Sequence, residues 1–167
     1  MKKSFKKIAL ITMLTVLSSS MSAGNVKQGV EELSPGLRTL LSKEMLGIEK
    51  GMKDIFSYTI TGKYNDIEKV AMQIHKSFIL KQNITKDQVK EIKTKIPKDF
   101  IKLDKKLHNY AKELASAARK KDAVLVNFYT YKMTESCVSC HSLYVKKRFP
   151  SFTLNNKSLA NTMKKAH

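Results

Sequence analysis

The sequence predicts an all-α protein whose main helices pack as an up-down-up-down four-helix bundle. Apolar residues recur every three or four positions in four long segments, and prolines, glycines and capping residues mark the segment ends. No stretch alternates apolar and polar residues as a half-buried strand would. Each segment therefore has one apolar face, and four such faces are buried together in a bundle.

The first helix is predicted to begin at Ser34 and Pro35, because proline is favoured in the first turn. It is expected to end before Gly62, a residue type common just past a helix. The apolar stripe between these points is Leu37, Leu41, Met45, Ile48, Met52 and Ile55. The second helix is expected to start at Asn65 or Asp66 and run to about Gln82, with the stripe Ile67, Val70, Ile74 and Phe78.

Thr85 and Gln88 resemble a capping box that opens a further helical stretch. Pro97 is expected to kink or restart this stretch. The stripe beyond it has the period of a bundle seam, with Phe100, Leu103, Leu107, Tyr110, Leu114 and Ala117. A charged turn at residues 119–122 then reverses the chain.

The last helix is predicted from residue 123 onward and is expected to end at Pro150. Its stripe consists of Ala123, Val126, Thr130, Met133, Cys137, Cys140 and Tyr144. Both cysteines of the chain thus lie on the face that is expected to point into the core.

Residues 1–23 have the layout of a secretory signal peptide, with four lysines, an apolar run of ten residues and small residues up to Ala23. We expect cleavage after Ser22 or Ala23 and export to the periplasm. Residues 24–150 would then form the folded domain, and residues 151–167 a basic, polar and loosely ordered tail.

The formal net charge of +18 favours an anionic partner. Lysines are spread along every segment and do not alternate with aromatic residues in one block, as they would in a nucleic-acid-binding surface. The chain is also expected to be exported, away from nucleic acid. Nucleic acid is therefore the least expected partner.

Cys137, Cys140 and His141 form a Cys-x-x-Cys-His motif, for which a disulfide, a zinc ion and haem are the candidates. On a helix these three side chains share one face. A redox disulfide motif is expected near a strand-helix-strand pattern, and a disulfide between adjacent turns closes too small a loop to stabilise the fold. Closed zinc sites need four ligands, and the remaining histidines have no finger-like spacing.

Cys-x-x-Cys-His is the known attachment signature of c-type haem. Each thiol can add to one vinyl group of the porphyrin, while the adjacent imidazole coordinates the iron. The motif therefore predicts one covalent haem c, with Cys137 and Cys140 as thioether tethers and His141 as the proximal iron ligand.

This motif on the last of four helices, with Tyr144 three residues after His141, resembles the class II c-type cytochromes, the cytochrome c prime family. Arg38 shortly before Met45 also matches, and the likeness covers about Leu33 to Phe149. It implies that the haem lies near the C-terminal helix with Tyr144 in its vicinity. The chain departs from the family at Val145, where relatives commonly carry arginine or lysine.

The resemblance also implies that the first helix supplies the residue opposite the haem histidine. Met45 lies near that position, and a methionine there suits electron transfer. An apolar residue would instead leave the iron open to gases such as nitric oxide. Leu41, Leu46 and Met52 are alternatives on the same helix, and His75 and His108 are further candidate ligands.

We expect a single-electron carrier, with a gas-binding protein as the alternative. No constellation of acid, base and nucleophile indicates an enzyme. The positive charge predicts redox partner proteins with acidic docking faces. The family resemblance implies a possible homodimer through the first helices.

Overall fold

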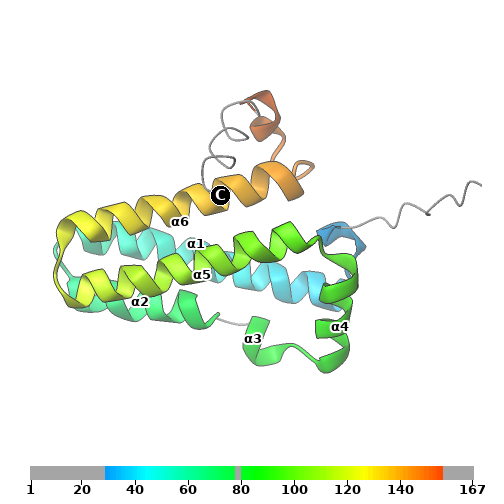
Figure 1. The fold of residues 1–167 in the computed structure, drawn as a ribbon, viewed down its shortest axis with the longest axis horizontal. Coiled ribbons are helices and arrows are strands. Elements are labelled where there is room, and N and C mark those ends of the chain that lie inside the picture. Colours follow the sequence, from blue (N-terminus) through cyan, green and yellow to red (C-terminus); the bar gives the residue numbers. More distant parts are fainter. Residues whose placement is uncertain (1–28, 78–79, 156–167) are drawn as a thin grey trace, which may run out of the picture.

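The computed structural model describes residues 29–77 and 80–155, and every regular element in these two ranges is a helix (Figure 1). The all-α prediction is thereby confirmed. The helices are α1 (Pro35–Ile60), α2 (Tyr64–Lys76), α3 (Leu80–Asn83), α4 (Lys86–Lys95), α5 (Lys98–Arg119) and α6 (Ala123–Tyr144). Two short 3-10 helices, η1 (Val30–Glu32) and η2 (Pro150–Asn155), flank them.

The four long helices α1, α2, α5 and α6 surround the main hydrophobic core, in an arrangement compatible with the predicted bundle (Figure 1). Helix α5 packs against both α2 and α6, and α1 contacts the same two helices. Fully buried side chains of the core include Ile55, Ile67, Ile74, Leu114, Val126 and Met133.

Within the described ranges, no helix is long and apolar enough to cross a membrane. The predicted signal peptide lies outside these ranges.

Several predicted helix boundaries are confirmed. Ser34 is the N-cap of α1 with Pro35 as its first residue, and Gly62 has a positive φ of 66° just past its end. Helix α5 restarts directly after Pro97. At the start of α6 the Leu125 N–H donates to the Asp122 carboxylate at 2.9 Å, so the charged turn also supplies a cap.

The predicted end of the second helix is wrong, because α2 stops at Lys76 and not near Gln82. Ser77 adopts a φ of 66°, which a helix cannot contain, and its hydroxyl donates to Glu44 Oε1 at 2.8 Å. Glu44 lies on α1 and is only 2% exposed. Its other carboxylate oxygen accepts from the Leu80 N–H at 3.0 Å. This buried carboxylate therefore holds the break between α2 and α3. Phe78, predicted as part of the α2 stripe, lies outside the described residues.

The predicted capping box is confirmed at the start of α4. The Gln88 N–H donates to Thr85 Oγ1 at 3.2 Å, and the Thr85 N–H donates to Gln88 Oε1 at 3.0 Å. Helix α4 lies at one end of the long helices (Figure 1) and helps to enclose a second, smaller core around Leu33, Leu37 and Ile96. The first turn of α1 is thereby buried at the same end.

The predicted end of the last helix is also wrong. Helix α6 stops at Tyr144, six residues before Pro150, and Val145 leaves the helical region with φ −130° and ψ 35°. A turn follows, and η2 then begins at Pro150. Regular structure thus extends into the segment that was expected to be loosely ordered. This return of the chain places residues beyond α6 against the helix.

Candidate functional site

Cys137, Cys140 and His141 lie in the last turns of α6. Both cysteines are free and half-buried, and Cys137 packs against the main core. This placement is the opposite of the helix N-terminus at which reactive cysteines are commonly activated.

The two thiols are held in their protonated form. Burial raises the pKa of Cys140 to about 12, with additional contributions from the negative charge of Asp104 and from Cys137. Burial also raises the pKa of Cys137. The arrangement therefore does not suit a thiolate that exchanges disulfides in solution.

The imidazole of His141 stacks on the ring of Phe149, with centroids 4.5 Å apart and planes inclined by 16°. Burial lowers the pKa of His141, and the positive charge of Arg148 lowers it further. The imidazole is therefore neutral at neutral pH, which is the form that can ligate a metal. Arg148, which exerts this effect, lies seven positions after His141 in the chain.

Three small polar residues of α6 are buried around the motif, and sequence periodicity alone did not identify them. Ser136, Ser139 and Ser142 are each at most 6% exposed. Each hydroxyl donates to a carbonyl of its own helix, at 2.9 Å, 2.8 Å and 3.0 Å respectively. The three serines recur at every third position of the segment SCVSCHS. This spacing is the sequence signal that could have predicted a row of small buried residues beside the cysteines.

Met45, the predicted distal ligand, is half-buried and packs against the same core cluster as Cys137. The alternatives on α1 lie in different surroundings: Met52 packs against this core too, Leu41 packs against the second core, and Leu46 is 57% exposed. The ring contact of His141 is to Phe149. The structure thus brings Met45 and Cys137 to one core and places the His141 ring against the segment after α6.

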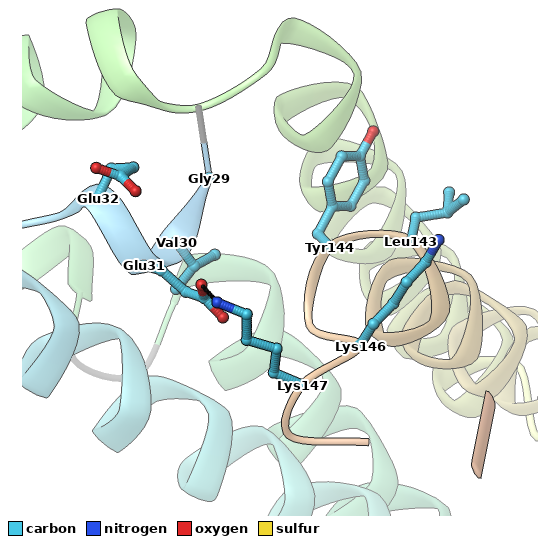
Figure 2. Close-up of a pocket in the computed structure, with 8 residues that line it drawn as sticks. All are labelled: Gly29, Val30, Glu31, Glu32, Leu143, Tyr144, Lys146 and Lys147. Carbon is cyan, nitrogen blue, oxygen red and sulfur yellow. Dashed lines mark hydrogen bonds and ion pairs between the residues drawn. The ribbon is translucent and has the colours of Figure 1, made fainter. Parts of the chain in front are cut away.

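Tyr144 lies at the end of α6, where its ring packs edge-on against Phe100 with centroids 5.3 Å apart. It also lines a crevice of about 180 Å³ between η1 and the turn after α6, in which Lys147 forms an ion pair with Glu31 at 2.7 Å (Figure 2). Cofactor pockets typically measure roughly 300–1,000 Å³. This crevice is therefore too small and too charged to be a haem pocket.

Comparisons of the chain with protein-family models, with curated proteins and with solved structures found no match. Any assignment of a function must therefore rest on the residues at the site. Two free, half-buried thiols at positions i and i+3 and a neutral imidazole at i+4 fit the donor set of a c-type haem. Among the described residues, no group of three or more histidine, cysteine or acidic side chains is arranged to hold a metal ion.

His75 and His108, the other candidate ligands, instead form reciprocal contacts between α2 and α5. Nδ1 of His75 lies 3.0 Å from the His108 carbonyl, and Nδ1 of His108 lies 2.6 Å from the Ile74 carbonyl. Nε2 of His108 lies 3.6 Å from Asp104 Oδ1. These histidines therefore hold two core helices together through their side chains.

The pKa of His108 is raised. Burial by itself lowers it, but the Asp104 carboxylate and the bond to the Ile74 carbonyl outweigh that effect. Protonated His108 should thus stabilise the folded chain fully below its ordinary pKa of about 6.5, and this stabilisation is lost as pH rises through the raised pKa. Asp104→Asn is expected to lower the pKa of His108 and to remove this pH-dependent part of the free energy of unfolding.

The measurement is an NMR titration of the His108 ring, together with urea unfolding at about pH 5 and about pH 8. Asp99→Asn is the control, since it removes a mainly exposed carboxylate near the start of the same helix. A His108 pKa that stays unchanged in Asp104→Asn would contradict the expectation.

Proposed function

We propose that the chain is a single-haem c-type cytochrome of the class II kind, exported to the periplasm, that carries single electrons. The observation that supports this most strongly is the Cys137-x-x-Cys140-His141 motif on α6, with both thiols free and half-buried. In this proposal Cys137 and Cys140 hold the haem through thioether bonds, and His141 binds the iron. When bound, the haem supplies a centre that accepts and releases one electron.

The remaining residues of the site have positioning roles in this proposal. Phe149 stacks on His141 and restricts the orientation of its ring. The buried serines flank the cysteines with small side chains, which allows close approach of a large flat group. Because Cys137 packs against filled core, attachment requires the side chains at this end of α6 to move apart. The up-down-up-down arrangement of residues 24–150 belongs to the same proposal.

The direct test is to produce the protein in a host with the c-type maturation machinery and to denature the purified product. Haem that remains attached after denaturation, at one equivalent per chain, would support the proposal. A correctly processed protein without colour would overturn it.

The identity of the sixth ligand decides between a carrier and a gas binder. The core position of Met45 supports its role as ligand, so the oxidised wild type should show the methionine-iron charge-transfer absorption band. Met45→Ala is expected to lose this band and to lower the reduction potential, because a methionine ligand raises it. Met52→Ala, which alters another half-buried methionine of α1, is the matched control.

Two outcomes of this experiment would contradict the assignment of Met45. A charge-transfer band that survives Met45→Ala would show that another residue ligates the iron. A high-spin wild type that changes its spectrum on adding nitric oxide would favour the gas-binding alternative.

Electron exchange is expected to be steered by charge, since the chain has 32 lysine and arginine residues against 14 acidic residues. Raising the salt concentration from about 0.01 M to about 0.15 M shortens the screening length from about 30 Å to about 8 Å. Transfer to an acidic redox protein should therefore slow markedly, whereas transfer to a neutral small-molecule oxidant should not. Stopped-flow rates that are independent of salt for both would contradict the expected acidic partner.

A further inference from the structure

Large apolar side chains are exposed at the end of the protein that holds the α1–α2 and α5–α6 turns. On α1, Phe56 is 65% exposed and Ile60 is 70% exposed. On α6, Val124 is 78% exposed and Phe128 is 50% exposed. Figure 1 shows both turns at this end, and α1 and α6 are in contact. Apolar side chains that gather at one place on a surface indicate an interaction site.

The two turns at the same end carry unpaired positive charge. Three exposed lysines occupy them: Lys63 between α1 and α2, and Lys120 and Lys121 between α5 and α6. Among the described residues, no acidic side chain forms an ion pair with any of these three lysines. The turns lie close to each other, because Arg119 of α5 forms an ion pair with Glu68 of α2 at 2.7 Å. The acid of the second turn, Asp122, already accepts a hydrogen bond as the N-cap of α6.

The backbone at Lys121 is unusual for a lysine. Its φ of 55° lies in the left-handed region that favours glycine. The Lys121 N–H donates to the Ala118 carbonyl at 2.9 Å just past the end of α5, where glycine is the common residue. The turn itself therefore does not explain why a lysine is present. Unfavourable backbone conformations are concentrated at functional sites, and the side chain at this one is an exposed positive charge.

Exposed apolar side chains beside unpaired lysines fit the surface of a bilayer that contains anionic lipid. Apolar groups can enter the boundary between head groups and acyl chains, while the lysine ammonium groups stay at the lipid phosphates. An acidic protein would be attracted to lysines all over this chain, since they are spread along every segment. A second copy of the chain would bring the same unpaired lysines together and would be repelled.

We propose that this end of the protein docks on an anionic membrane surface. The exposed apolar side chains of α1 and α6 enter the head-group boundary, and the three turn lysines contact lipid phosphates. Because an α-helix rises about 1.5 Å per residue, Cys137 and Cys140 lie roughly 20–24 Å along α6 from Val124. Docking therefore leaves the motif end of α6 free for a soluble redox partner. The proposal itself does not depend on the haem.

The test is co-sedimentation of the matured protein with lipid vesicles, after intact mass spectrometry has confirmed that the predicted signal peptide is absent. The wild type should bind vesicles of mixed phosphatidylcholine and phosphatidylglycerol, and should bind phosphatidylcholine alone only weakly. Lys120→Gln combined with Lys121→Gly should lower the partition coefficient roughly 25-fold, because each lysine near an anionic surface contributes about fivefold. Lys90→Gln combined with Lys93→Gln removes the same charge from exposed positions of α4, at the opposite end, and should lower binding far less (Figure 1).

The apolar part of the site is tested at Phe128. Phe128→Ala should lower the partition coefficient at least about fivefold, because less apolar surface then leaves water on docking. Phe128→Trp should bind at least as well as the wild type, since tryptophan is favoured at membrane interfaces.

Lys121→Gly by itself separates docking from folding. Glycine adopts the backbone conformation at this position more readily, so urea unfolding should show a variant at least as stable as the wild type. Its weaker binding to vesicles would then come from the lost charge.

Three results would overturn the proposal. The first is a wild type that binds neither kind of vesicle, whether it stays monomeric, forms dimers or binds only an acidic protein. The second is equal binding to both kinds of vesicle. The third is an equal loss of binding in the turn and α4 variants. Covalent haem is measured in parallel and tests only the proposed function.

Discussion

Replacing both Cys137 and Cys140 by serine is expected to abolish covalent haem attachment. Serine preserves the size and helical placement of each side chain, but its hydroxyl does not form the thioether bond. Both positions lie on α6 with half-buried side chains, so the helix itself should persist. Intact mass spectrometry and haem staining after denaturing electrophoresis measure the loss, which should be complete.

Single variants and a control sharpen this experiment. Cys137→Ser and Cys140→Ser should each retain at most one thioether bond and yield less matured protein. Thr134→Ser alters an exposed residue one turn before the motif and should leave attachment unchanged. Covalent haem in the double variant would refute the tether assignment of both cysteines.

Glu44→Ala is expected to lower the free energy of unfolding by about 2–4 kcal/mol. The carboxylate of Glu44 is buried and accepts hydrogen bonds from the Ser77 hydroxyl and the Leu80 N–H. Alanine leaves these two donors without that acceptor and leaves a gap between α1 and the start of α3. Urea unfolding followed by circular dichroism measures the change.

Glu49→Ala is the matched control, because it makes the same change on the same helix. Glu49 is exposed and forms an ion pair with Lys53 at 2.6 Å, so its removal should change stability little. Equal effects of the two substitutions would show that Glu44 does not hold the α2–α3 break. Because Met45 follows Glu44 directly, the spectrum of Glu44→Ala also shows whether this anchor positions the proposed ligand.

Local patterns were sufficient to predict much of the fold. The proline at the start of α1, the capping box of α4 and the restart after Pro97 each depend on residues close together in the sequence. The three- and four-residue repeats of apolar residues correctly predicted four long helices. Such features are visible in the sequence because their physical causes act within one or two turns of the chain.

Long-range contacts account for the boundaries that were predicted wrongly. Helix α2 was expected to continue through Ser77, but the acceptor that stabilises its early end is Glu44, 33 residues earlier in the chain. At the other end, α6 stops at Tyr144, and the returning chain places Phe149 on His141. The helical periodicity of either segment does not reveal these contacts, because the contacting residues come close to each other only when the chain folds.

The sequence by itself determined that the chain is helical and where most of its helices begin. It also determined that two thiols and an imidazole lie close together, at positions i, i+3 and i+4 of the last helix. Only the tertiary structure decided how deeply these groups are buried and which neighbours change their pKa values. Burial and the charges of Asp104 and Arg148 keep the thiols protonated and His141 neutral. The physical reason is that desolvation and through-space electrostatics depend on how the helices pack together, and a local sequence pattern does not specify that packing.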